Sequence, residues 1–154
     1  MSPGYAGFSG EYGRAGRQLG LEVSAVRVES AEQLPGLLRG AMGQADAIWL
    51  PPDPLLITNE SVMIFREFSW ANRIPLYATT KGQAREGACA SVGISFAASG
   101  AAAAGAAKAL RAGGPVPEVV FPDEAEVTLN AGAAKRCGLD FPPEILKESD
   151  YLFP

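Results

Sequence analysis

The chain has 154 residues, of which 47% are hydrophobic and 19% charged, and its formal net charge is -4. This size and composition fit one globular domain and exclude a disordered tail or a collagen-like repeat. Because the charge balance is acidic, the chain has few residues from which to build the basic face of a nucleic-acid-binding protein, and we expect no nucleic-acid partner.

The sequence contains no histidine, which removes the usual nucleophile-base pairs of hydrolases, histidine-ligated metals and the commonest general base. Cys89 and Cys137 form no CxxC pair, which excludes a zinc or thioredoxin-type site. We expect no metal and no cofactor. The two cysteines form one disulfide or are two buried thiols, and the high burial of free cysteine favours thiols. No apolar run approaches the roughly 20 residues that span a bilayer, and no signal peptide follows Met1. The chain is predicted to be soluble and not an enzyme.

The first half of the chain alternates helical and strand patterns. Ser9 is expected to cap the first helix after a loop over 2–10, and LEVSAVRV (21–28) alternates as a strand does. Ser30 and Gln33 have capping-box spacing before an apolar helical period. DAIWL (46–50) is typical of a strand buried on both faces. Helices are thus expected over 11–19, 34–41 and from residue 59 or 60, and strands over 21–28, 46–50 and 75–78.

The second half continues with shorter elements. A polar loop is expected over 79–82, and Asn130 is expected to cap a brief helix. Strands are predicted over 88–96, 117–121 and 126–130, and helices over 97–112, 131–137 and 142–148. Strands alternating with helices predict an α/β fold with a three-layer arrangement, a parallel sheet flanked by helices. No linker or internal repeat interrupts the pattern, so we expect residues 1–154 to form a single domain.

Ligands of open parallel sheets bind outside the carboxyl ends of the strands. The residues that follow the predicted strands, together with the opening loop, combine hydroxyls, a carboxylate, an ammonium group and an aromatic ring, which suits a small polar or zwitterionic ligand. The candidate ligand-binding residues are Tyr5, Ser9, Asp53, Thr79, Thr80 and Lys81.

Each candidate also has a purely structural explanation. Asp53 lies between prolines, where aspartate commonly forms a turn through its own backbone. Thr79 and Thr80 are candidates for capping the following segment, and Lys81 for a solvated surface charge. Tyr5 is as compatible with core or surface as with a pocket wall.

The helix expected over 97–112 consists almost entirely of small residues, with Gly100 and Gly105 among the alanines. Alanine favours helix but offers little side chain to bury. Close approach by another layer is therefore expected, either within this chain or at an interface with a partner.

A succession of motifs resembles the ABC-transporter substrate-binding protein family that is related to receptors for tryptophan and other amino acids. The resemblance runs from DAIWLPPD through IPLYATTKG to the final ESDYLF. The matching residues are Ala90-Ser91-Val92-Gly93, Leu129-Asn130, Ala134, Gly138-Leu139, Phe141-Pro142-Pro143 and Ser149-Asp150.

The resemblance implies a type I periplasmic-binding fold, in which two α/β lobes close on a ligand. It implies that residues 1–154 are a single C-terminal lobe, without the N-terminal lobe and without the strand that would lead into SPGYAG. Within this lobe, 113–154 would be a return segment of short strands and helical turns. In the family fold the small-residue helix would pack on that other lobe. Asp53 matches the family's aspartate after the second strand, Thr79 and Thr80 fall at small polar cleft positions, and Lys81 falls at a frequently acidic one.

The function implied is that of the solute-binding component of an ABC uptake transporter. Its partners would be an amino-acid-like ligand and, for the full-length protein, an ABC permease, in an extracytoplasmic location. The alternative is a self-associating sensory or interaction domain of the same fold, a homodimer through the small-residue helix or an open sheet edge.

Overall fold

A computed structural model describes residues 5–122 and 124–154, with side chains from residue 10 onward. Five strands form one sheet in the order β1-β2-β3-β4-β5. The elements are α1 (Tyr5–Gln18), a 3-10 turn η1 (Ala31–Gln33), α2 (Leu34–Ala41), β1 (Ile48–Trp49), α3 (Asn59–Asn72), β2 (Leu76–Ala78), α4 (Lys81–Arg85), β3 (Ala90–Gly93), α5 (Phe96–Arg111), β4 (Glu126–Asn130), α6 (Ala131–Arg136), α7 (Pro143–Glu148) and β5 (Tyr151–Phe153).

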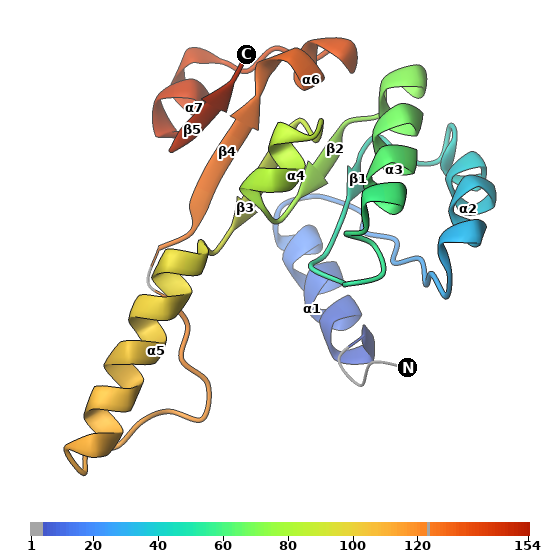
Figure 1. Cartoon of the computed structure of the whole chain (residues 1–154). Coiled ribbons are helices and arrows are strands. Elements are labelled where there is room, and N and C mark those ends of the chain that lie inside the picture. The colour runs from blue at the N-terminus through green and yellow to red at the C-terminus, as the bar shows by residue number, and fades with distance from the viewer. Residues whose placement is uncertain (1–4, 123) are drawn as a thin grey trace.

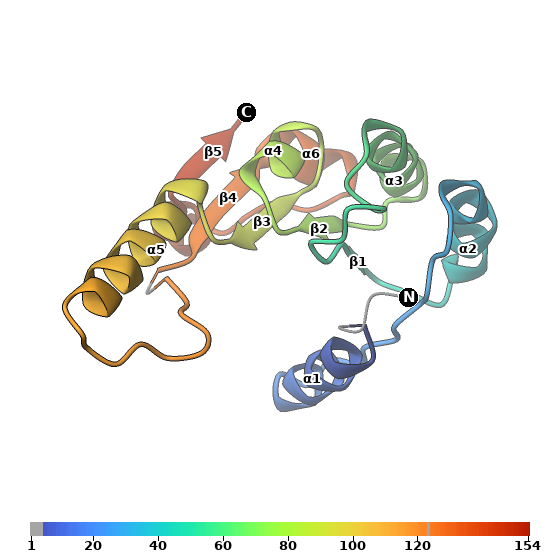
Figure 2. The same ribbon diagram turned by 60° about the horizontal axis from the view of Figure 1, so that its bottom comes forward.

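The sheet is parallel except at one junction. β1, β2 and β3 run parallel, β4 pairs antiparallel with β3, and β5 is parallel to β4. Helices α3 and α4 lie on one side of the sheet, and α1 lies on the other (Figure 2). The expected α/β arrangement with helices flanking a mainly parallel sheet is therefore present, with one antiparallel pairing that the sequence pattern does not predict.

Two apolar clusters hold the layers together. The first joins α2, α3 and the sheet through Leu34, Phe65 and Leu76, which are 1%, 5% and 1% exposed. The second packs α6 against the start of β3 through Cys89, Ala133, Ala134 and Cys137. Burying large apolar side chains in this way stabilises a domain by about 1.5–3 kcal/mol for each one.

The N-terminal part corrects two predictions. The first helix begins at Tyr5, so Ser9 lies inside α1 and does not cap it. The expected strand over 21–28 is extended coil, and its Leu21 and Val26 are both 59% exposed. Alternation makes a strand only where a neighbouring strand supplies hydrogen bonds, and among the described residues this segment pairs with none.

Other predicted strands are shorter or missing. β1 keeps only Ile48–Trp49, and Trp49 is 43% exposed, so the expectation of a strand buried on both faces is wrong. β1 is the edge of the described sheet and has a neighbour on one side only. The expected strand 117–121 is coil, with Phe121 78% exposed. The expected strand over 88–96 shortens to β3, and β5 was not predicted.

Helix α5 stands apart from the rest of the fold (Figures 1 and 2). None of its residues is buried, and Phe96 in its first turn is 94% exposed. Close packing within the chain, one of the two explanations for its small residues, is therefore absent from the described part. No described helix is long and apolar enough to cross a membrane.

Candidate functional site

Three parts of the chain meet where β2 and β3 end. β2 ends at Ala78 and β3 at Gly93, on the same edge because these strands are parallel. Gly93 is the register partner of Glu126, so β4 begins beside the end of β3. Thr128 pairs with Tyr151, which brings the start of β5 to the same edge. The antiparallel junction thus adds the C-terminal segment to the edge at which the sequence predicts a ligand.

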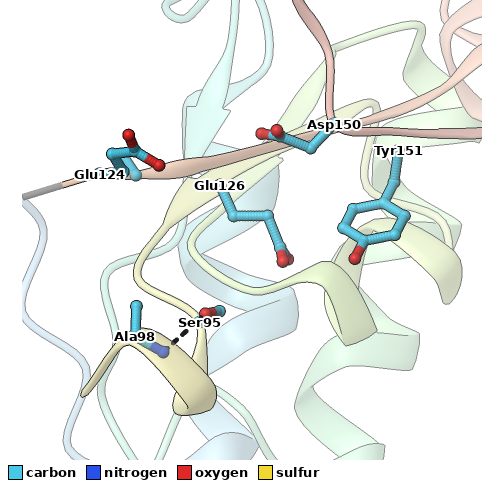
Figure 3. Close-up of a pocket in the computed structure, with 7 residues that line it drawn as sticks. Ser95, Ala98, Glu124, Glu126, Asp150 and Tyr151 are labelled. Carbon is cyan, nitrogen blue, oxygen red and sulfur yellow. Dashed lines mark hydrogen bonds between the residues drawn. The ribbon is translucent and has the colours of Figure 1, made fainter. Parts of the chain in front are cut away.

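A hollow of about 310 Å³ lies at this edge. It is lined by Ser95, Ala98, Glu124, Ala125, Glu126, Asp150 and Tyr151. The side chains of Glu126 and Tyr151 extend toward the side on which Ser95, the N-cap of α5, lies (Figure 3). The lining offers carboxylates, hydroxyls and one aromatic ring, which are groups suited to binding a polar ligand.

Lys81 brings a positive charge next to this hollow. Its Nζ lies 2.8 Å from the centroid of the Tyr151 ring, a cation-π contact between the first turn of α4 and β5. Asp150 also has a structural partner, because its Oδ2 accepts a hydrogen bond from the Val127 amide at 2.7 Å. The ammonium group and the carboxylates therefore lie around one aromatic ring.

Thr80 serves as the N-cap of α4. Its hydroxyl accepts from the Gln83 amide at 3.3 Å and donates to Gln83 Oε1 at 3.0 Å, and that same Oε1 accepts from the Thr80 amide. This reciprocal capping box satisfies free amides at the helix start. The short helix α4 replaces the loop expected over 79–82.

Among the candidates whose side chains the structure describes, Thr79 has a hydroxyl that makes no hydrogen bond within the fold. Its amide donates to Gln83 Oε1 at 3.3 Å. Its Oγ1 is buried and has no hydrogen-bond partner among the described residues. A buried hydroxyl without a partner is costly, so Thr79 retains hydrogen-bonding capacity at the sheet edge.

Asp53 has the geometry of a turn. Its Oδ1 accepts from the Leu55 amide at 2.8 Å, and its carbonyl accepts from the Leu56 amide at 2.9 Å. It follows β1, two strands from β3, and it does not line the hollow around Tyr151. The structure therefore does not bring Asp53 to the hollow beside Lys81 and Tyr151.

The two N-terminal candidates belong to α1 rather than to a loop. Tyr5 and Ser9 are helical, and their side chains lie outside the described residues. The described part of α1 contacts the sheet through Tyr12, whose ring lies edge-on to Trp49 with centroids 4.7 Å apart.

Sequence reasoning missed all seven residues that line the hollow, of which Ser95, Glu124, Glu126, Asp150 and Tyr151 carry polar or charged groups. Asp150 stood in a matching motif, but the pairing of β5 with β4 is needed to bring it here. Ser95 could have been identified from the sequence, because serine before a helical run is a typical N-cap. In the structure its hydroxyl accepts a hydrogen bond from the Ala98 amide at 3.1 Å. No group of three metal-ligating side chains occurs among the described residues.

The sequence matches the family described as ABC transporter substrate binding protein over residues 13–152, and the chain belongs to that family. This is a family of substrate-binding proteins rather than of enzymes. No curated protein sequence matches the chain.

Three solved structures share the fold. An ABC domain from Streptococcus pneumonia, solved in complex with L-Trp, has a TM-score of 0.78 and 21% identity, and the match covers 96% of this chain and 50% of that one. A conserved domain protein from Vibrio cholerae has a TM-score of 0.77, 13% identity and coverages of 96% and 50%. The ligand-free, open structure of CD0873, a substrate binding protein with adhesive properties from Clostridium difficile, has a TM-score of 0.73, 20% identity and coverages of 99% and 52%.

The family match confirms the resemblance, and the solved structures confirm the periplasmic-binding-protein-like fold. The chain spans about half the length of each structure that it matches.

Proposed function

We propose that this chain forms one lobe of an extracytoplasmic solute-binding protein, which binds a small amino-acid-like ligand between two lobes and delivers it to an ABC permease. The observation that carries the proposal is the polar hollow at the carboxyl edge of β3, next to Lys81 and Tyr151. A zwitterion presents an ammonium and a carboxylate, for which Glu126 and Lys81 supply opposite charges.

Two further observations support a two-lobe arrangement. The solved relatives are about twice as long as the match, and one of them was solved with L-Trp bound. Helix α5 extends from the edge that carries the hollow and exposes Phe96 and Leu110, which are 94% and 63% exposed. A second lobe packed on α5 would also cover the hollow and exclude water from the ligand.

The experiment is a thermal-shift screen of the chain against the standard amino acids at concentrations up to tens of millimolar. We expect a small shift for one chemical class, because one lobe makes only part of the contacts and closure contributes much of the affinity of such proteins. Glu126→Gln should reduce the shift. Glu144→Gln on α7, outside the hollow, is the matched control and should leave it unchanged.

Two results would contradict the proposal. One is the absence of any shift across the screen, and the other is a shift that Glu126→Gln leaves intact. Asp53→Ala, Thr79→Ala and Thr80→Ser belong in the same series, because these residues remain candidates for ligand contact. Loss of the shift in Asp53→Ala would assign the site to the end of β1 instead.

Self-association is the competing use of the same surface. The edge of β1, which pairs with no further strand in the described part of the chain, and the exposed face of α5 would both serve a second copy of the chain. Sedimentation at several concentrations separates the two functions. A monomer across the range supports a lobe that requires a different partner, whereas a concentration-dependent dimer that Phe96→Ser abolishes supports the self-associating domain.

A further inference from the structure

Two cysteines that are distant in the sequence share one buried cluster. Cys89 precedes β3 and is 0% exposed, and Cys137 follows α6 and is 6% exposed. Both pack with Ala133 and Ala134. Both cysteines are free thiols in the structure, the state that the high burial of free cysteine favours.

Hydrogen bonds of the fold hold the segments that carry Cys89 and Cys137 next to each other. The Asn130 amide donates to the Cys89 carbonyl at 2.9 Å, which places the start of α6 beside Cys89. Asn130 then caps α6, with its Oδ1 accepting from the Ala133 amide at 2.8 Å. The helix returns Cys137 to the same cluster, where its Sγ lies 3.3 Å from Ser69 Oγ.

We infer that Cys89 and Cys137 are a modification site at which an intramolecular disulfide forms under oxidising conditions. With a small-molecule disulfide as the oxidant, the Cys137 thiolate attacks one sulfur and releases one thiol, which leaves a mixed disulfide. The Cys89 thiolate then attacks Cys137 Sγ, forms the protein disulfide and releases the second thiol. Two protein thiols are oxidised, one disulfide of the oxidant is reduced, and the two thiol protons pass to the released thiols.

The exchange is expected to be slow in the folded chain. Burial raises the pKa of the Cys89 thiol to about 12, so little of the reactive thiolate exists at neutral pH. The bond therefore forms while the chain folds, before the cluster closes.

The disulfide would close a loop of residues 90–136, whose two ends belong to the sheet and α6 while its middle part is exposed. Residues 90–136 include α5, none of whose residues is buried, and the coil that leads back to β4. The bond would tie β3 covalently to α6. The chain would then stay in one piece if the exposed α5 region were cut.

The test uses the full chain, unfolded, reduced and then refolded in a buffer of oxidised and reduced glutathione. Free thiols are alkylated after denaturation, and the mass shows how many groups were added. We expect none after oxidative refolding and two after refolding with excess reductant. A second sample is cut with trypsin after Arg111, which is exposed in the last turn of α5. Its fragments should remain joined until a reductant is added.

Cys89→Ser and Cys137→Ser are the matched controls, and the fragments of both should separate without reductant. The wild-type alkylation result does not depend on either variant folding. A folded monomer that accepts two alkyl groups after oxidative refolding would overturn the inference, as would disulfides that link only different chains. Ligand binding does not enter these readouts, so they do not depend on the transport role.

Discussion

Gly93 at the end of β3 lies directly against the backbone carbonyl of Thr79. A β-carbon on Gly93 would overlap the Thr79 oxygen and crowd its carbonyl carbon, so no side chain fits there. The close approach holds the ends of β2 and β3 together at the candidate site. It also explains why a glycine stands in a strand, where glycine normally weakens the structure.

Gly93→Ala is expected to destabilise the chain by about 1–3 kcal/mol, because the methyl group forces the two strand ends apart. The free energy of unfolding in urea measures the loss. Gly100→Ala on α5 is the matched control, since nothing lies within 4 Å of a β-carbon there. That change should stabilise the helix by about 0.5–1 kcal/mol. Equal effects at both positions would show that the contact with Thr79 is not tight.

Asn130→Ala is expected to cost about 2–3 kcal/mol of unfolding free energy. The side chain caps α6 and also donates from Nδ2 to the Ala84 carbonyl at 2.8 Å, in a buried position. Asn130→Asp keeps the capping oxygen and loses the donor, so urea unfolding of the two variants separates the two roles. A loss in Asn130→Ala below about 0.5 kcal/mol, the lower limit for a cap, would contradict both.

The contact between Lys81 and Tyr151 is expected to contribute about 0.5–1 kcal/mol. A double-mutant cycle with Lys81→Met and Tyr151→Leu measures it through urea unfolding. Tyr151→Phe keeps the ring and should preserve most of the coupling, which identifies the ring face rather than the hydroxyl as the partner. Strict additivity of Lys81→Met and Tyr151→Leu would rule out the interaction.

The stability of the reduced chain is expected to fall in strongly alkaline solution. The pKa of Cys89 rises from an ordinary 9.0 to about 12, mainly because the thiol is buried, so the folded state holds its proton more tightly than the unfolded state. This contribution is complete below pH 9 and is lost as the pH rises from 9 to about 12. Urea unfolding with excess reductant at pH 8, 9.5 and 11 measures it.

Cys89→Ala is the comparison for that pH series. The difference between wild type and variant should shrink as the pH rises, whereas a constant difference would contradict the raised pKa. Burial also raises the pKa of Tyr77, so the variant should still lose some stability above pH 10.

The sequence predicts the start of a helix well where a capping side chain binds the free backbone amides of the first turn. Asn130 was expected to cap a helix and does so. Ser30 illustrates the limit: it precedes η1 without a side-chain cap, while Gln33 Oε1 accepts from the Glu29 amide at 3.0 Å. The donor is the residue before Ser30, so neither hydrogen bond of the expected capping box forms there.

The strands and the site depend on pairing, which the sequence of one segment does not contain. Residues 21–28 have the right alternation and find no neighbour among the described residues, whereas Tyr151–Phe153 become a strand because β4 lies beside them. The candidate site follows the same logic. Lys81 was identified from its place after a strand, but Glu126 and Tyr151 reach it only through the antiparallel pairing of β3 with β4.

That antiparallel pairing has an architectural consequence. Gly93 at the end of β3 and Glu126 at the start of β4 are paired on adjacent strands. The chain therefore leaves the sheet and returns to it at neighbouring positions. The intervening stretch is topologically an enlarged hairpin turn, and a two-residue turn could in principle span the same gap. An attachment of this kind can lengthen, shorten or be exchanged during evolution without altering the register of a single strand.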